Sequence, residues 1–250
     1  MERRGLVKGA LILGGAWAIV ARPWNWGRAP ELEFEPFDPV PGFRRLSLGG
    51  QVTGGGLTGG GAGGAVLLGL DASPARDAAV EARVRAEVEP LLWSGWTGGA
   101  PVPVTYFTDI RCPLCRLLEP RLATLEGITL TTREYPLFGA ASELAARAVL
   151  AAGRQGAAEA MRERLHRTRA VSGADALGPL AEGLGLDGGQ FRADLDGAEV
   201  AARLAEDRAL AGLFGLPGTP SLIIGRTRVV GVQPDAVLRA VIADEALARG

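Results

Sequence analysis

The sequence predicts an α/β fold in which a mixed sheet is flanked by helices and a helical insertion separates two halves of the domain. Three observations lead to this prediction. Short apolar runs alternate with helical patterns over residues 65–135, as in parallel βαβ units. Residues 140–214 have a helical pattern throughout. Two short apolar runs at 221–224 and 228–230 precede an amphipathic helix at 235–246, which indicates an antiparallel strand pair at a sheet edge.

The order of these elements also sets the domain boundaries. We expect a linker and loop rich in proline and glycine at 25–64, with a short strand at 43–48, and then one domain at 65–246 with its helical insertion at about 140–214. The first half of the domain is predicted to contain strands at 65–70, 102–107 and 128–135, a helix that starts at Ser73-Pro74, and a helix that runs from Cys112 to about Glu126.

Composition narrows the classes of function. The 250 residues are 47% hydrophobic and 22% charged, which is typical of a globular protein with a sizeable core. The formal net charge of −1 gives no basic field for a nucleic-acid partner. His166 is the sole histidine, and Cys112 and Cys115 are the sole cysteines, so these residue types cannot complete a four-ligand zinc site. We therefore expect no resident metal.

The N-terminus has the pattern of an export segment. Arg3, Arg4 and Lys8 precede an uncharged, mostly apolar run at 9–21. That run is short for a membrane span and suits a secretory signal, and the paired arginines also resemble a twin-arginine signal. We expect residues 1–24 to be a signal peptide or an N-terminal membrane anchor, which places the remainder in a periplasmic or other extracytoplasmic space. The alternative is a buried N-terminal helix in a cytosolic protein.

The motif Cys112-Pro113-Leu114-Cys115 carries the chemistry. It lies between a predicted strand and a predicted helix, where a Cys-x-x-Cys pair indicates redox use. The first thiol lies where helix N–H groups and the helix dipole favour a thiolate, which is the nucleophile. Cys112 is thus expected to attack, and Cys115, nearer the interior, to resolve the mixed disulfide. Pro113 stiffens the turn without leaving an N–H group unsatisfied.

Two other uses of the cysteine pair stay open. The pair closes too small a loop to stabilise the fold strongly as a structural disulfide. A metal site, such as a copper site in an assembly factor, needs further ligands, and His166 is the sole histidine available. We expect His166 to be structural or exposed.

Three motifs in order resemble the DsbA, DsbC and DsbG group of periplasmic disulfide oxidoreductases and isomerases, which have the thioredoxin fold. They are the run from Tyr106 to Cys115, the run from Phe214 to Gly225 with its Gly-Thr-Pro sequence, and the run from Val229 to Pro234. The helical block between the first two runs is similar to the helical insertion of these proteins. The resemblance covers roughly residues 100–245.

The resemblance implies roles for the second motif. Pro220 would carry a cis peptide bond and face the cysteines, with an ordinary trans proline as the alternative. Thr219 would offer its backbone to an extended substrate, as in strand addition, and Pro113 and Leu114 would contact the same substrate. No cofactor is expected beyond a redox-active Cys112–Cys115 disulfide.

This chain departs from the strongly oxidising DsbA pattern at Leu114, where that pattern has a thiolate-stabilising histidine. We therefore expect a less oxidising disulfide. Arg111 and Arg116 are expected to tune the pKa of the thiol by favouring its thiolate, and Asp109 to oppose them. Asp109 has two candidate roles, to cap the active-site helix or to transfer a proton. Arg133 and Glu134 on the next strand are weaker candidates for an acid near the buried Cys115 thiol.

The leading hypothesis is an exported thiol-disulfide oxidoreductase that acts as an oxidase, isomerase or reductase on secreted proteins. Its expected partners are unfolded or misoxidised secreted proteins and a membrane thiol redox partner of the DsbB or DsbD type. Contact with the membrane is expected only through the N-terminal segment, and contact with nucleic acid is not expected. The alternative is a non-catalytic protein of the same fold that binds copper or acts as a chaperone-type assembly factor.

Overall fold

The computed structural model describes residues 31–48, 50, 52, 77–94, 96, 99, 101–168 and 173–248. By its contacts the chain divides into Met1–Pro30 and Glu31–Gly250, and every described element belongs to the second unit. The predicted export segment, the predicted strand at 65–70 and the predicted helix start at Ser73-Pro74 lie outside the described residues. Within the described ranges, no helix has the length and apolar character needed to cross a bilayer.

Six strands form one mixed sheet in the order β1-β2-β6-β5-β3-β4. The strands are β1 (Phe34–Pro36), β2 (Arg44–Leu46), β3 (Val102–Thr108), β4 (Ile128–Glu134), β5 (Ser221–Ile224) and β6 (Thr227–Val230). β3 and β4 are parallel, whereas β5 runs antiparallel to both of its neighbours, β3 and β6. The predicted mixed sheet and its four strands beyond residue 100 are thus confirmed.

Two predictions about the sheet are wrong. The prediction of linker is wrong for residues 34–36, which form β1, whereas the short strand predicted at 43–48 is observed as β2, which pairs antiparallel with β1 and in parallel with β6. Consequently the β5–β6 pair lies inside the sheet and not at its edge. The reason is aromatic packing, since Phe37 stacks on Phe214 with ring centroids 5.7 Å apart and Phe43 meets the same ring edge-on at 5.2 Å.

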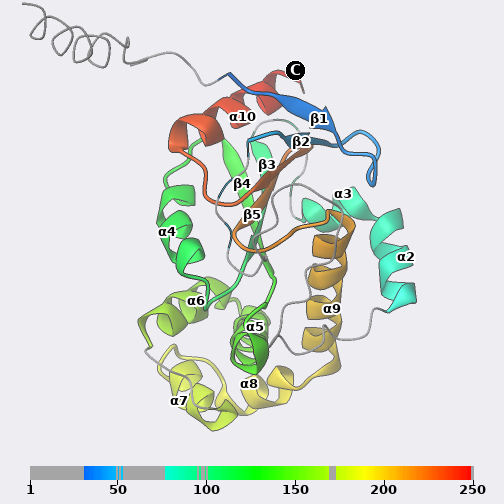
Figure 1. The fold of residues 1–250 in the computed structure, drawn as a ribbon. Helices are drawn as coiled ribbons and strands as arrows, with labels where there is room; N and C mark the ends of the chain where they lie inside the picture. The colour runs from blue at the N-terminus through cyan, green and yellow to red at the C-terminus, as the bar shows by residue number, and fades with distance from the viewer. Residues whose placement is uncertain are drawn as a thin grey trace, which may run out of the picture. The chain divides into compact units, whose positions relative to one another are not determined.

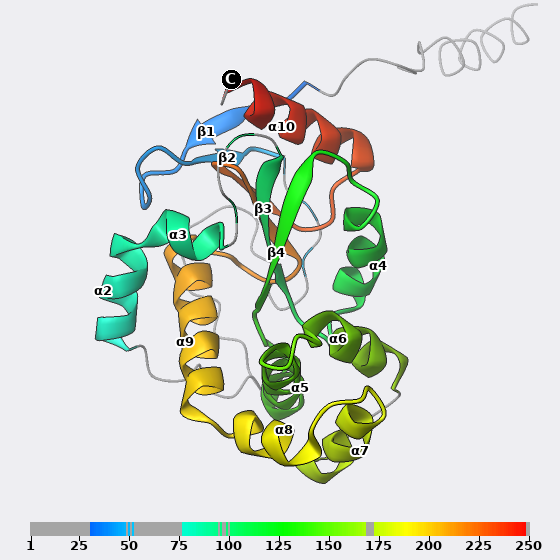
Figure 2. The ribbon, with the colours of Figure 1, turned by 180° about the vertical axis from the view of Figure 1, so that it is seen from behind.

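The helices cover both faces of the sheet. They are α2 (Ala78–Ala86), α3 (Val88–Leu92), α4 (Pro113–Leu122), α5 (Gly139–Gly153), α6 (Ala158–Arg167), α7 (Leu177–Glu182), α8 (Gly188–Leu195), α9 (Ala198–Leu213) and α10 (Asp235–Leu247), with a 3₁₀ turn at Ala174–Ala176. Figure 1 and Figure 2 show α4 and α10 along one side of the sheet and α2, α3 and α9 along the other. The predicted helical block at 140–214 corresponds to α5–α9.

Strand alternation explains why β3 supports two cores. Val102, Val104 and Tyr106 point to the face under α4 and α10, where the core also contains both cysteines. Phe107 points to the opposite face and packs with the aromatic and aliphatic core under α9. A third core fills the space among α5–α8, and Ile110, just after β3, packs into it. The end of β3 is therefore the place where the sheet meets the helical insertion.

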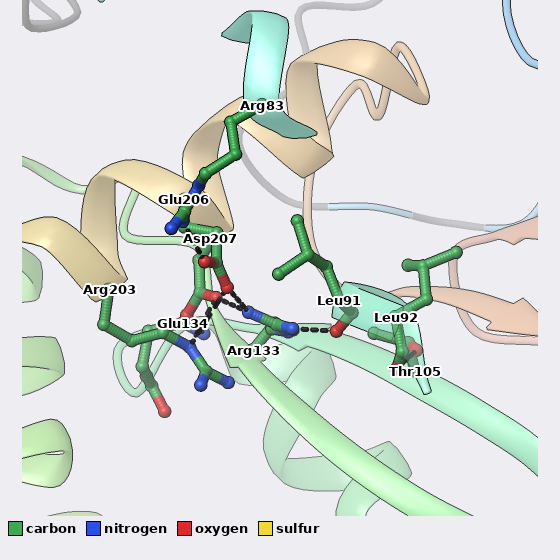
Figure 3. Close-up of polar contacts among 9 residues, drawn as sticks. All are labelled: Arg83, Leu91, Leu92, Thr105, Arg133, Glu134, Arg203, Glu206 and Asp207. Carbon is green, nitrogen blue, oxygen red and sulfur yellow. Dashed lines mark hydrogen bonds and ion pairs between the residues drawn. The ribbon is translucent and has the colours of Figure 1, made fainter. Parts of the chain in front are cut away.

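A buried ionic cluster fastens α9 and α3 to the sheet. Arg133 on β4 is fully buried and donates to Glu206 at 2.5 Å and to Asp207 at 2.7 Å, both on α9 (Figure 3). Its guanidinium also donates to the carbonyl oxygen of Leu91 on α3. Asp207 in turn accepts from the backbone N–H of Glu134 at 3.0 Å. These bonds satisfy the buried charges and fix α9 across the end of β4.

Candidate active site

Cys112 lies at the N-cap of α4, with Pro113 in the first turn. Its backbone is extended (φ −75°, ψ 116°), and its sulfur accepts the backbone N–H of Cys115 at 3.2 Å. This N–H belongs to the first turn, whose donors have no partner within the helix. A negative charge on the sulfur of Cys112 would therefore be stabilised by a hydrogen bond and by the helix dipole.

The predicted Gly-Thr-Pro loop lies against this sulfur. The thiol of Cys112 donates to the carbonyl oxygen of Thr219 at 3.4 Å, across 107 residues of sequence. The Thr219–Pro220 peptide bond is cis, as predicted. The backbone N–H of Gly231 donates to the carbonyl oxygen of Pro220 at 2.9 Å, and the hydroxyl of Ser221 donates to the carbonyl oxygen of Gly218 at 2.7 Å. Pairing of β5 with β3 thus brings the loop to the first turn of α4.

Cys115 occupies the other side of the turn, against β3. Both cysteines are present as thiols and both are fully buried, so burial does not distinguish them. Burial raises the pKa of the Cys115 thiol, and its interaction with the Cys112 sulfur adds to this rise. A hydrogen bond with the side chain of Thr108 and one with the backbone of Asp109 oppose the rise. What separates the two sulfurs is their surroundings, Thr219 for Cys112 and Thr108 for Cys115.

The carboxylate of Asp109 does not cap the active-site helix, contrary to one of the two predicted roles. It accepts from the backbone N–H groups of Arg111 at 2.8 Å and Leu137 at 2.7 Å, and from the hydroxyl of Ser142 at 2.8 Å. Asp109 is 1% exposed. It therefore ties the turn before Cys112 to the start of α5, because the first residues after β3 and after β4 run side by side.

The flanking residues of the motif face outward. Pro113, Arg111 and Arg116 are exposed, and Leu114 is half-buried against the core that contains the cysteines. Leu117, one turn along α4, is 62% exposed and adds an apolar side chain to the outer face of the helix. Pro113, Arg111, Arg116 and Leu117 thus lie at the surface beside the motif.

Sequence reasoning missed Glu119, a carboxylate on α4 that is hydrogen-bonded to two side chains of β3. Glu119 accepts from the hydroxyl of Thr108 at 3.0 Å and from that of Tyr106 at 3.4 Å. Its other oxygen is 2.7 Å from Nε2 of His166, on α6. The signal was present in the spacing, since residues four apart on a helix share a face, and Glu119 follows Cys115 by four. His166 is half-buried and paired, which fits the structural role expected for it.

Arg133 and Glu134, the sequence candidates for a group near Cys115, are engaged elsewhere. Arg133 belongs to the cluster on α9, on the far face of the sheet (Figure 3). The carboxylate of Glu134 pairs with Arg162 on α6 at 2.7 Å, and both side chains are less than 5% exposed. Glu134 ends β4, so its side chain meets the helical insertion and not the cysteine turn.

Metal-binding residues do not gather anywhere in the described part of the chain. In those ranges, no three His, Cys, Asp or Glu side chains come together as metal ligands would. His166, the histidine that a copper site would need, is bound to Glu119. The arrangement around Cys112 and Cys115 is that of a dithiol beside a proline loop.

Comparison with known proteins agrees with this geometry. The model of the DSBA-like thioredoxin domain family matches residues 103–243. A thioredoxin-like oxidoreductase from Silicibacter pomeroyi is 29% identical, with a TM-score of 0.55 over 64% of this chain and 98% of that chain. The thiol-disulfide exchange protein α-DsbA2 from Wolbachia pipientis has the same fold, with 22% identity and a TM-score of 0.54 over 69% of this chain and 98% of that chain.

Among curated proteins, the chain is similar to part of a Na(+)/H(+) antiporter NhaA 1 from Salinispora arenicola. The identity is 36% over 137 residues, which is 52% of this chain, and the chain spans 21% of the antiporter's length. Since the family match covers the cysteine turn, the helical insertion and the cis-proline loop, and more than half of the sequence, the chain belongs to the family of DSBA-like thioredoxin domains.

Proposed function

We propose that this protein is an exported thiol-disulfide oxidoreductase that exchanges disulfides with cysteines of secreted proteins. The observation that carries the proposal is the position of the Cys112 sulfur. It lies between the first N–H groups of α4 and the carbonyl oxygen of Thr219, beside the cis peptide bond of Pro220. The N–H groups of α4 favour a thiolate on Cys112, and the loop at Thr219 and Pro220 presents backbone groups to an extended substrate.

The exchange has two steps. In the reducing direction, the Cys112 thiolate attacks one sulfur of a substrate disulfide and forms a mixed disulfide, and the substrate's other sulfur leaves as a thiolate. The Cys115 sulfur then attacks the Cys112 sulfur, so the Cys112–Cys115 disulfide forms and the second substrate thiolate leaves. The substrate is reduced by two electrons and the Cys112–Cys115 pair is oxidised by two. The oxidising direction is the reverse of these steps.

Several further parts of the proposal follow from the sequence. Thr219, Pro113 and Leu114 contact the substrate, and the Cys112–Cys115 disulfide is the sole redox group, with no added cofactor. A membrane thiol redox partner of the DsbB or DsbD type resets the cysteines. The segment at 1–24 exports the protein, or retains it at the membrane through residues 9–21.

The test compares Cys112→Ser with Cys115→Ser in a reaction with glutathione disulfide, analysed by mass after acid quenching. We expect Cys112→Ser to show no exchange and Cys115→Ser to accumulate a one-to-one adduct on Cys112. The wild-type chain should pass through the adduct to the intramolecular disulfide. Full exchange activity in Cys112→Ser would overturn the proposal. A reporter fused after residue 30 that is active only outside the cytoplasm tests export.

A further inference from the structure

A line of hydrogen-bonding side chains leads away from the buried Cys115 thiol. Thr108, at the end of β3 and on the same face as Tyr106, interacts with the Cys115 thiol and lowers its pKa, and the Thr108 hydroxyl donates a hydrogen bond to Glu119 at 3.0 Å. Tyr106, two residues earlier on the same strand, donates to the same carboxylate oxygen at 3.4 Å and also contacts Cys115. Two neighbouring side chains on one face of the strand thus connect the thiol to one carboxylate.

The same line ends near solvent. Cys115 and Thr108 are 0% exposed, whereas the side chains of Glu119 and His166 are 18% and 16% exposed. The buried end contains the reacting sulfur, and the half-buried end contains a carboxylate that can exchange a proton with water. Thr108 is the intermediate, because a hydroxyl both accepts and donates a hydrogen bond.

Charged groups on α6 and β4 and a hydroxyl on β3 surround Glu119. Burial favours its neutral form, but the hydrogen bond and charge of His166, the charge of Arg162 and the hydrogen bond from Thr108 together lower the pKa of Glu119 below its ordinary value. Glu134 on β4 adds a second carboxylate, which pairs with Arg162. Tyr106 remains protonated, because burial raises the pKa of its hydroxyl. Glu119 is therefore the group in this line that takes up or releases a proton.

We propose that the Thr108 hydroxyl and the Glu119 carboxylate form the proton route of Cys115, and that His166 from the helical insertion positions Glu119 for this role. The inference rests on the proposed thiol-disulfide exchange. Thr108 is then a catalytic residue, since it touches the reacting sulfur, and His166 is a positioning residue. The helical insertion contributes to the chemistry through one side chain.

The proton balance is explicit in both directions. When Cys115 attacks the mixed disulfide, its proton passes to the Thr108 oxygen while the Thr108 proton passes to Glu119, and the Cys112–Cys115 bond forms as the substrate thiolate leaves. When a substrate thiolate opens the Cys112–Cys115 disulfide, Cys115 leaves as a thiolate and receives a proton from Thr108, which is replenished from protonated Glu119. Without this route a buried thiolate would persist at high cost.

The test measures the second step of exchange separately from the first. Reduced protein is mixed with glutathione disulfide between pH 5 and 8, and acid-quenched samples are separated by mass into dithiol, mixed disulfide and intramolecular disulfide. General acid–base groups commonly contribute on the order of 100-fold or more. We therefore expect Thr108→Val and Glu119→Gln to slow resolution of the mixed disulfide by about that factor, while the first step keeps its rate.

Two comparisons separate a proton route from a structural role. Thr108→Ser retains the hydroxyl and should restore resolution, whereas Thr105→Val, which removes a buried hydroxyl bonded to the carbonyl oxygen of Leu92, should leave resolution unchanged. His166→Gln removes the charge that helps to lower the pKa of Glu119. As the pH is lowered, the rate at which this variant resolves the mixed disulfide should therefore begin to fall at a higher pH than in the wild-type chain. The same fall should be absent in Glu119→Gln.

The outcomes are distinct. If Thr108→Val resolves the mixed disulfide as fast as Thr105→Val, or if Glu119→Gln and His166→Gln keep the wild-type pH profile, the route is wrong although exchange itself stands. If the wild-type chain never forms the mixed disulfide, the proposed function fails instead. Should Glu119→Gln not fold, the pair Thr108→Ser and Thr108→Val still decides the question.

Discussion

The sulfur of Cys112 lies 3.4 Å from the carbonyl oxygen of Thr219, although 107 residues separate the two. The whole helical insertion lies between them in sequence. They meet because β3, which precedes Cys112, pairs antiparallel with β5, which follows Thr219, so that Phe107 lies opposite Ser221. The site is thus a product of strand pairing across the insertion.

Leu114 should keep the cysteine pair from being strongly oxidising. Its side chain packs against the core and has no hydrogen-bond donor for the Cys112 thiolate. We expect a wild-type reduction potential near or below about −200 mV, and we expect Leu114→His to raise it by about 30 mV or more, which is equivalent to about 1.4 kcal/mol. Equilibration with glutathione buffers measures both values.

The control for this prediction is Leu117→His, which places the same ring one turn further along α4, on an exposed position. Its potential should equal that of the wild-type chain. A wild-type value near about −120 mV would show that the thiolate is stabilised without a histidine, and the argument from Leu114 would then be wrong.

Asp109 should be a structural anchor of the cysteine turn. Its carboxylate accepts three hydrogen bonds, from Arg111, Leu137 and Ser142. Asp109→Ala removes a buried carboxylate that accepts all three bonds and leaves its donors without that partner, so the free energy of unfolding should decrease by about 3 kcal/mol or more. Ser142→Ala removes one of the three bonds and should cost about 1 kcal/mol. Denaturant unfolding measures both, and equal losses in the two variants would contradict the anchor role.

Glu134 should make the stability depend on pH. Burial raises its pKa to about 7, with Asp207 and Glu119 adding repulsion and Arg162 opposing the rise. In the unfolded chain the carboxyl titrates at the ordinary value of 4.5. Between these two values the folded state binds more protons than the unfolded state, so the free energy of unfolding falls as the pH rises through that window.

Glu134→Gln cannot titrate and should lack this fall. The difference in unfolding free energy, variant minus wild type, should therefore grow by about 3 kcal/mol between pH 4 and pH 8. Glu163→Gln, at a position 65% exposed on α6, is the matched control and should follow the wild-type curve. Parallel stability curves for Glu134→Gln and the wild-type chain would refute the prediction.

The sequence by itself determined the elements whose patterns are local. The strand at Val102–Thr108, the helix that opens after Cys112 and the helical block each follow from periodicity and composition, and they are confirmed. The Cys112-Pro113-Leu114-Cys115 motif and the Gly-Thr-Pro run were likewise readable, because both consist of adjacent residues. The cis state of Thr219–Pro220 followed from resemblance and is observed.

Only the tertiary structure decided which residues surround the thiols. The short strand β1 looks like linker sequence, since three residues give no periodicity. It is a strand because it pairs with β2, which adds to β6, and because Phe214 offers a surface for Phe37. Arg133 and Glu134 lie on the strand that follows the cysteine motif in sequence, and were therefore candidates for neighbours of Cys115. In the structure Glu134 pairs with Arg162 on α6, and Arg133 pairs with Asp207 on α9. Glu119 and His166 meet because α6 packs beneath α4, and a contact between residues 47 apart depends on packing that no local pattern encodes.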